Sequence, residues 1–370
     1  MNIFKRKNKL NSNPTVNVQN NGLLTVEPEK VPVYEDGRQE DGETIVRLVS
    51  NRRPKKAYKV SGIDDVASKN NWKAWIYLFP VIVLITVFLL YPLINTIFIS
   101  FTENYLYSAG TYDGFTLNNF GVILHITPHT AGGEEVWETA FTEYAIPNTF
   151  IITIVTVPVS IALALIIALA LNSLKWFQKF LQTVFFLPYV TNAIAIGMVF
   201  SVIFDDTGVI NYIFGTDTVW VYGATQTIGM IPLCIYIVWN SIPFKILILL
   251  SGLQGIDKQY YQAAQIDAAP KGKVVWRITI PLLGPQILYL MITSFIGAFK
   301  EYTSIVSIFN GPSTWGKNSS TKNMLTIVYY VYDNLASQTS YAAAAAVFLF
   351  LIILAFTGLQ FLVSKRRVHY

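Results

Sequence analysis

The sequence predicts an all-α integral membrane protein that crosses a bilayer about six times. Hydrophobic residues make up 53% of the 370 residues and charged residues only 13%, whereas soluble domains average about 45–50% and about 25%. The apolar residues come in long blocks, and the lysines and arginines gather in alternate segments between those blocks. These three observations favour a polytopic membrane protein over a soluble one.

Six apolar stretches are each long enough to cross the hydrocarbon core, which takes about 20 helical residues. They cover residues 75–101, 146–171, 180–204, 227–253, 282–309 and 341–363. Prolines lie within or beside most of them, and a proline removes a backbone hydrogen bond and can kink a helix. Membranes tolerate such kinks where neighbouring helices or a wet cavity satisfy the freed carbonyls. The pattern fits a transporter or channel better than a passive anchor.

Basic residues divide the connecting segments into two kinds. Of the 27 lysines and arginines, 14 lie in residues 1–73 and nine more in residues 172–179, 251–277 and 365–367. Residues 102–145 and 205–226 contain none. Because basic loops remain on the cytoplasmic side, both termini are predicted to be cytoplasmic. The same distribution accounts for the net charge of +5 without a nucleic-acid partner.

Three segments follow from this topology: a polar tail (1–70), the first transmembrane helix with an acidic extracytoplasmic loop (71–145), and a transmembrane core (146–365). The tail shows no helical or strand periodicity and is expected to be disordered, with a regulatory or partner-docking role as the alternative. Its basic residues 52–59 are expected near anionic lipid head groups. The tail lacks the features of a cleaved secretory signal, so the first span is expected to serve as an uncleaved one.

Motifs of membrane enzymes are missing from the sequence. There is no HExxH, GxSxG or glycine-rich phosphate loop, and the three histidines are too scattered for a metal site. We therefore expect no metal or cofactor on this chain and no ATP hydrolysis by it. An ion-coupled secondary transporter is a stronger rival, but such proteins usually carry several intramembrane carboxylates. Here the predicted spans hold essentially one, Glu301. A membrane-embedded enzyme is a further alternative.

The inner loop at residues 252–281 has the character of a docking segment. A short helix is expected after Asp257, with small residues grouped on one side: Ala263, Ala264, Ala268 and Ala269. Small residues let another surface approach the backbone closely, whereas a helix lying at the head groups would present large apolar residues. The composition favours a helix that inserts into a cytoplasmic partner.

This loop resembles the coupling loop of binding-protein-dependent ABC importer permeases, whose pattern is EAA, a glycine four residues after the second alanine, and a later I-x-L-P. In this sequence the pattern reads Gln262, Ala263, Ala264, Asp267 and Ala268, followed by Ile278, Ile280 and Pro281. Gln262 replaces the glutamate and Ala268 the glycine. Residues 185–211 and 239–257 are similar to sugar permeases of the maltose and oligosaccharide type, and the resemblance runs from about residue 72 to the C-terminus.

The resemblance implies an ABC type-1 importer transmembrane fold. It also implies a permease subunit of an ATP-driven, binding-protein-dependent carbohydrate importer in the bacterial cytoplasmic membrane. The implied partners, besides membrane lipid, are a second homologous permease subunit, two ATP-binding subunits that hold ATP and Mg²⁺, and an extracytoplasmic sugar-binding protein. The positions implied to couple to the ATP-binding subunits are Gln262, Ala263, Ala264, Asp267, Ala268 and Pro281.

Carrying the family's sugar-contacting positions over to this sequence points to two helix faces, made by Asn240, Ser241 and Phe244 and by Ser294, Ala298 and Glu301. Independently of the family, Ser294, Ala298 and Glu301 recur at i, i+4 and i+7, on one side of a helix. Helix packing is the alternative role for Ser294 and Ala298, because small residues favour close contact in membranes.

Lys245 directly follows Phe244 and is included among the substrate-binding candidates. We hypothesise that the Glu301 carboxylate accepts hydrogen bonds from sugar hydroxyls and is held charged by Lys245 or Lys300.

Overall fold

The computed structural model describes residues 16–18, 24–26, 71–131, 133–174, 178–314 and 322–367. The chain divides into two compact units, Met1–Leu90 and Tyr91–Tyr370. The first unit holds strands β1 (Val16–Val18) and β2 (Leu24–Val26), which pair antiparallel, and then helix α2 (Asn71–Ile85) and a π-helical turn η1 (Thr86–Leu90). The remainder of the tail lies outside the described residues, so its disorder stays a prediction.

The second unit begins with α3, and the segment predicted as an acidic loop after it contains several short strands and a helix. Helix α3 (Tyr91–Ser100) leads to the paired strands β3 (Thr102–Glu103) and β4 (Gly114–Phe115), then to helix α4 (Asn118–Ile123) and the pair β5 (His129–Ala131) and β6 (Glu134–Val136). The buried Asn119 amide donates to the carbonyls of Ser100 at 2.9 Å and Thr102 at 2.8 Å. These bonds tie α4 to the end of α3, so the loop has a fixed local structure.

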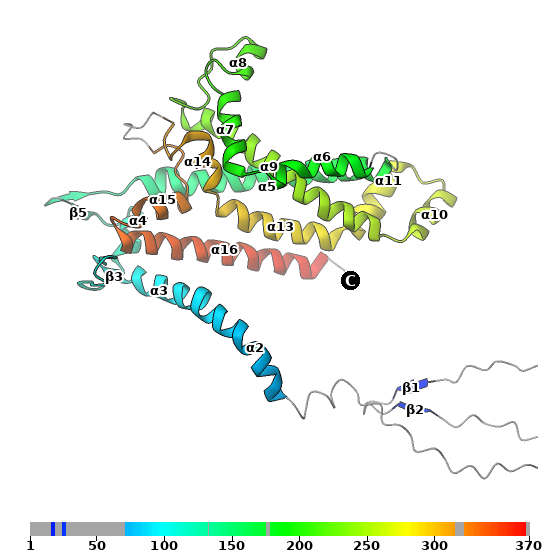
Figure 1. Cartoon of the computed structure of the whole chain (residues 1–370), viewed down its shortest axis with the longest axis horizontal. Helices are drawn as coiled ribbons and strands as arrows, with labels where there is room; N and C mark the ends of the chain where they lie inside the picture. Colours follow the sequence, from blue (N-terminus) through cyan, green and yellow to red (C-terminus); the bar gives the residue numbers. More distant parts are fainter. Residues whose placement is uncertain are drawn as a thin grey trace, which may run out of the picture. The chain divides into compact units, whose positions relative to one another are not determined.

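Four long helices form the body of the second unit and run alongside one another (Figure 1): α5 (Ile146–Ser173), α9 (Gln226–Gly255), α13 (Gly284–Phe299) and α16 (Thr339–Arg367). Helix α5 continues the π-helical turn η2 (Phe141–Ala145) and contacts both α9 and α13. The buried alanines Ala164 and Ala168 lie in the core that α5 shares with α9 and α13, where small side chains let helices approach closely.

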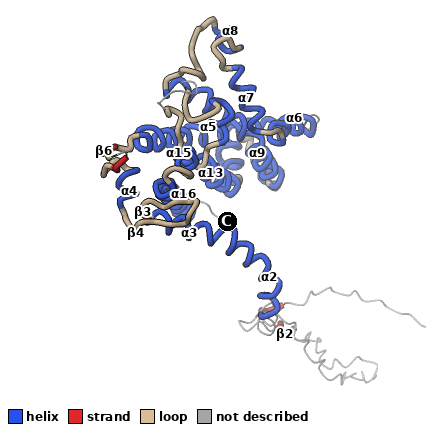
Figure 2. The backbone as a smooth tube through the Cα atoms, turned by 60° about the vertical axis from the view of Figure 1, so that its left-hand side comes forward, coloured by secondary structure: helices blue, strands red, loops and turns tan. Residues whose placement is uncertain are grey.

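Short helices lie at the two ends of this body (Figure 1). One end carries α10 (Lys258–Ile266), α11 (Lys271–Val274), the π-helical turn η3 (Val275–Thr279) and α12 (Ile280–Leu282). The other carries α4, α14 (Thr303–Phe309) and α15 (Ile327–Asn334). Helix α7 (Ala193–Ile203) projects from the body with α8 (Val209–Phe214) at its tip, and Figure 2 shows the same projection from another side.

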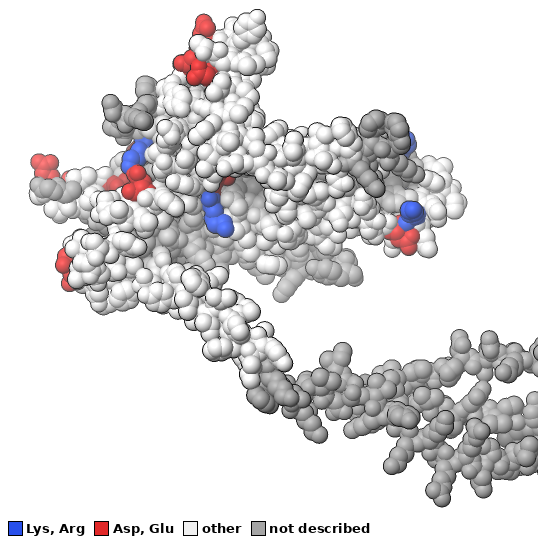
Figure 3. All heavy atoms as spheres, viewed as in Figure 1, with Lys and Arg blue, Asp and Glu red and all other residues white. Residues whose placement is uncertain are grey.

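The prediction of about six membrane crossings is confirmed. Four continuous apolar helices are long enough to span a membrane: Trp75–Ser100, Phe141–Ser173, Gln226–Gly255 and Thr339–Ser364. Two bent pairs bring the number to six if each pair is one span: Phe180–Val190 with Ala193–Ile203, bent by 94°, and Lys271–Leu282 with Gly284–Phe299, bent by 66°. On the visible face in Figure 3, charged side chains lie over the two ends and the projection and at one place near the middle of the body, and most of the remaining helix surface is uncharged.

Two of the predicted spans are not single continuous helices, so the prediction was wrong on this point. Residues 180–204 form α6 (Gln178–Val190) and α7 rather than one helix. The Asn192 side chain between them accepts the N–H groups of Ile194 at 2.9 Å and Ala195 at 3.4 Å, which caps the start of α7. Residues 282–309 also divide, because α13 ends at Phe299 and a separate helix, α14, begins at Thr303.

Candidate functional site

All seven residues predicted to bind substrate line one cavity of about 390 Å³. Helix α9 contributes Asn240, Ser241, Phe244 and Lys245, and the α13 segment contributes Ser294, Ala298 and Glu301. Ala298 is also buried in the apolar core between α5, α9 and α13, so it serves helix packing as well. The two helix faces inferred separately from the sequence thus meet across a shared space.

The cavity has further walls that the sequence did not reveal. Thr156 and Val157 come from α5, and Tyr189, Thr191 and Ala193 come from the bend between α6 and α7. These residues are distant in sequence from both predicted faces and share no spacing pattern with them. Thr293 and Gly297 also line the cavity, and the sequence could have predicted them because they neighbour Ser294 and Ala298 on α13.

Hydroxyl, amide and aromatic groups give this cavity its chemical character. The rings of Tyr189 and Phe244 stack with their centroids 5.7 Å apart and their planes 20° from parallel. The Ser241 hydroxyl donates to the Val238 carbonyl at 2.9 Å, so its lone pairs stay available as acceptors. Asn240 adds both a donor and an acceptor. This combination suits a small polar molecule that also has apolar faces.

Lys245 is a buried charge in the wall of the cavity. Its side chain is only 5% exposed, and the Nζ ammonium donates to Ser160 Oγ at 2.7 Å. A lysine at the centre of a membrane helix costs about 2.5–3.5 kcal/mol on insertion scales. Lys245 and Glu301 form no ion pair in this conformation, so the hypothesis that Lys245 neutralises Glu301 is wrong here.

Glu301 has a structural role that hydropathy concealed. Its carboxylate accepts the backbone N–H of Ser304 at 3.0 Å, in the first turn of α14. Its backbone carbonyl accepts the hydroxyl of Thr326, immediately before α15, at 2.9 Å. Lys300 is exposed and forms no ion pair with Glu301 either. The carboxylate is therefore stabilised by a backbone donor rather than by the proposed lysines.

The inner loop forms the short helix that the sequence predicted. The Asp257 side chain accepts the N–H of Gln259 at 2.9 Å and caps the start of α10. At the other end, Ala268 N–H donates to the Gln265 carbonyl at 3.1 Å and Ala269 N–H to the Ala264 carbonyl at 3.0 Å. This paired pattern is the Schellman motif, which places its C′ residue in the left-handed conformation.

Ala268 occupies that C′ position with φ of 50°. Glycine is the usual residue there because it has no Cβ to clash. The geometry therefore explains why a glycine fits this position. The chain makes the same sharp turn after α10 with Ala268 in place of glycine.

The four small residues of the inner loop do not share one environment, because Ala264 faces the chain's own body whereas Ala263 and Ala268 are exposed. Ala264 is only 6% exposed, and it lines, with Ala268 and Ala269, a cavity of about 520 Å³ that also borders α5. The exposed residues on and beside α10 include Gln262, Ala263, Asp267 and the nearly fully exposed Ile266. Pro281 is also exposed, on α12.

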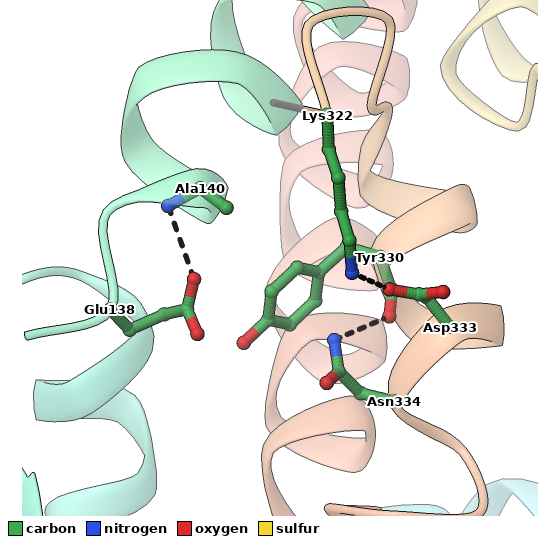
Figure 4. Close-up of polar contacts among 6 residues, drawn as sticks. All are labelled: Glu138, Ala140, Lys322, Tyr330, Asp333 and Asn334. Carbon is green, nitrogen blue, oxygen red and sulfur yellow. Dashed lines mark hydrogen bonds and ion pairs between the residues drawn. The ribbon is translucent and has the colours of Figure 1, made fainter. Parts of the chain in front are cut away.

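A polar cluster fixes the opposite end of the molecule (Figure 4). Lys322 forms an ion pair with Asp333, and the Asn334 amide donates to the Tyr330 carbonyl at 3.0 Å. The Tyr330 phenol points toward Glu138, whose carboxylate accepts the Ala140 N–H at 3.1 Å. Burial raises the pKa of the Tyr330 phenol, which keeps it protonated. Among the described residues, no three His, Cys, Asp or Glu side chains are grouped to hold a metal ion.

The long apolar helices and the polar cavity between them define a multi-pass helical membrane protein of the transporter class. Residues 160–369 match the family described as "Binding-protein-dependent transport system inner membrane component". The chain belongs to this family.

Curated relatives match along most of their length. The lactose transport system permease protein LacF of Rhizobium radiobacter is 30% identical over 79% of this chain and 94% of its own. The arabinooligosaccharides transport system permease protein AraP of Bacillus subtilis is 31% identical over 82% of this chain and 94% of its own.

A solved structure has the same fold. One chain of a bacterial ABC transporter involved in the import of the acidic polysaccharide alginate superposes with a TM-score of 0.65, over 81% of this chain and 98% of its own. At 19% sequence identity this likeness establishes the fold alone.

Proposed function

We propose that this chain is one of two transmembrane subunits of an ATP-driven importer that carries an oligosaccharide. The observation that carries the proposal is the cavity in which Asn240, Ser241, Phe244 and Ser294 meet. A sugar ring presents hydroxyls at its edge and an apolar C–H surface on its face. The amide and hydroxyl groups suit the former, and the Tyr189–Phe244 stack suits the latter. Relatives named for lactose and arabinooligosaccharide transport support the same substrate class.

The proposal assigns the energy source to other subunits. Two ATP-binding subunits would hold ATP and Mg²⁺ and would dock on α10 and its counterpart in a second, homologous permease subunit. In this chain the exposed residues Gln262, Ala263 and Asp267 offer the docking surface. The capped ends of α10 hold that surface in a fixed orientation. A movement of the docked subunits would thus pass to α9, which is separated from α10 by two residues.

An extracytoplasmic binding protein would deliver the sugar to the end of the molecule that carries α4, α14 and α15. Both termini are then cytoplasmic, in agreement with the basic residues at 1–73, 251–277 and 365–367. The protein would lie in the cytoplasmic membrane of a bacterium, with lipid around its apolar helices.

Purification and reconstitution of the assembled complex test this function. The sugar-loaded binding protein is expected to stimulate ATP hydrolysis and sugar uptake in proteoliposomes, without any ion gradient. Uptake that follows a proton or sodium gradient and needs no ATP would instead identify an ion-coupled transporter. Chemical conversion of a lipid or sugar by the isolated chain would identify a membrane enzyme.

A further inference from the structure

Lys245 carries a charge that the described part of the chain does not neutralise. Ser160 Oγ, at 2.7 Å from Nζ, is the only hydrogen-bond partner of this ammonium among the described residues. Over the same residues the only ion pair is the distant one between Lys322 and Asp333. An ammonium has three N–H donors, and a serine hydroxyl satisfies one of them without bringing a countercharge.

Buried charges in proteins are normally paired, because a lone charge in a low-dielectric interior is unfavourable. Intramembrane lysines accordingly mark functional sites and call for a named partner. The carboxylate that shares the cavity, Glu301, is already held by the Ser304 N–H and makes no ion pair with Lys245. No side chain in the described part of the chain therefore supplies the countercharge of Lys245.

The position of Lys245 favours a small ligand as the source of that countercharge. Its side chain helps to line the cavity, and Ser160 lies one helical turn from Thr156, another lining residue. Lys245 is also buried at 5% exposure, in a wall made by α5 and α9, and not on an open face that a second subunit could cover.

We propose that the transported oligosaccharide is anionic and that Lys245 binds its acidic group. This inference rests on the proposed function and narrows its substrate class to sugars that carry a carboxylate, such as uronates. An ionised carboxylate is an acceptor only, so it can take the free N–H donors of Lys245 and those of the Asn240 amide nearby. The low dielectric of the site strengthens this pairing relative to water.

The test uses the complete importer in proteoliposomes, with its paired permease, ATP-binding subunits and binding protein. The probes are matched trisaccharides of α-1,4-galacto, β-1,4-gluco and β-1,4-manno configuration, each as the neutral sugar and as the C6 uronate. Uptake is measured for the wild type, Lys245→Met, Lys245→Arg and Lys245→Gln. Because every variant uses the same binding protein, a change in the uronate-to-neutral uptake ratio reports on the cavity alone.

The wild type is expected to take up at least one uronate tenfold faster than its neutral counterpart. Lys245→Met should lower that ratio at least tenfold, which corresponds to about 1.4 kcal/mol, whereas Lys245→Arg should keep it. Ser160→Ala is the matched control, because it leaves the charge in place and should keep the ratio. If Lys245→Met fails to assemble, Lys245→Gln retains a polar donor without charge and should show the same loss.

Uptake of a neutral sugar at the rate of its uronate, or an unchanged ratio in Lys245→Met and Lys245→Gln, would overturn the inference while leaving an oligosaccharide importer in place. Loss of complex yield in the Lys245 variants that is repaired by removing a carboxylate of the second permease would also overturn it, because the countercharge would then be structural. Absence of ATP-driven uptake for every sugar-loaded binding protein would instead refute the proposed function itself.

Discussion

The Glu301 carboxylate accepts the backbone N–H of Ser304 at 3.0 Å, so a residue in the wall of the cavity also fixes the start of α14. The Glu301 carbonyl adds a bond from Thr326 at 2.9 Å, which joins the end of α13 to the residues before α15. The substrate role proposed for Glu301 and its structural role therefore belong to the same residue. Variants at this position have to be chosen so that the two roles can be separated.

Glu301→Ala and Glu301→Gln separate them. The alanine variant loses the bond to Ser304 and should be less stable by about 0.5–2 kcal/mol, as for other helix N-terminal caps. The glutamine variant keeps an oxygen acceptor for that N–H and should unfold at nearly the wild-type temperature. Sugar uptake should fall in both and further in the alanine variant. Thermal unfolding of the purified complex, measured beside uptake, checks both effects; wild-type uptake by Glu301→Ala would exclude a role in the substrate site.

The two cavity faces were predicted from the positions that the family resemblance implied, and on the fifth predicted span the spacing of the residues independently indicated the same side. The i, i+4, i+7 series ending at Glu301 is such a local signal. Tyr189 and Thr191 were not predicted, because the 94° bend between α6 and α7 brings them to the cavity and this bend is a tertiary feature. The end of α13 was not predicted either. The sequence stays apolar through residue 309, but the hydrogen bond to the Glu301 carboxylate marks the start of a new helix, α14.

The inner loop shows the same limit. Its helix was predictable from Asp257 and the residues that follow, because capping is local. The direction in which Ala264 faces was not predictable from the sequence. Ala264 faces inward because the loop folds back on the chain, where the Tyr261 hydroxyl lies 3.3 Å from Thr279 Oγ1. Such a contact between α10 and the segment after it leaves no periodic trace in the sequence.

The Tyr189–Phe244 stack should contribute to sugar uptake through its aromatic surface. Phe244→Leu preserves most of the apolar volume but removes the ring, and we expect uptake to fall about tenfold, or about 1.4 kcal/mol. Phe186→Leu is the matched control, because its ring contacts Tyr189 at 5.4 Å while Phe186 does not line the cavity. Initial uptake rates at several sugar concentrations provide the measurement. Equal losses in both variants would point to a general packing effect instead.

Ala268→Gly should stabilise the inner loop. The left-handed conformation costs an alanine about 1–2 kcal/mol, and glycine at this C′ position removes most of that cost. Ala263→Gly offers a control of opposite sign, because a glycine within a helix costs roughly 0.5–1 kcal/mol relative to alanine. Hydrogen exchange of the α10 amides should slow in the first variant and accelerate in the second. Faster exchange in Ala268→Gly would contradict the observed cap geometry.

The proposed topology predicts which sites an impermeant thiol reagent reaches from outside intact cells. In a Cys234→Ser background, cysteines at Thr111 and Thr216 should be labelled, and a cysteine at Lys271 should not. Thr111 and Thr216 lie in segments without lysine or arginine, whereas Lys271 begins α11 beside the inner loop. Labelling of the Lys271 site should appear only after the membrane is permeabilised. Labelling of the Lys271 site in sealed cells would show that the core has the opposite orientation in the membrane.

Neighbouring alanines on α10 provide the sharpest test of how the ATP-binding subunits dock. Ala263 is exposed, whereas Ala264 is 6% exposed and faces the chain's own cavity. Ala263→Trp should leave the permease folded but should lower the capture of ATP-binding subunits at least tenfold, because the indole blocks the docking surface. Ala264→Trp should change the stability of the permease itself, by about 1–3 kcal/mol if the indole overpacks the site.

Co-purification of the ATP-binding subunits, together with the unfolding temperature of the permease pair, distinguishes the two positions. Because both variants introduce the same side chain one residue apart, a difference between them reports on the direction each position faces. Stoichiometric capture by Ala263→Trp would mean that the exposed side of α10 is not the docking surface. Loss of capture by Ala264→Trp at unchanged permease stability would mean that α10 turns Ala264 toward the partner when the partner binds.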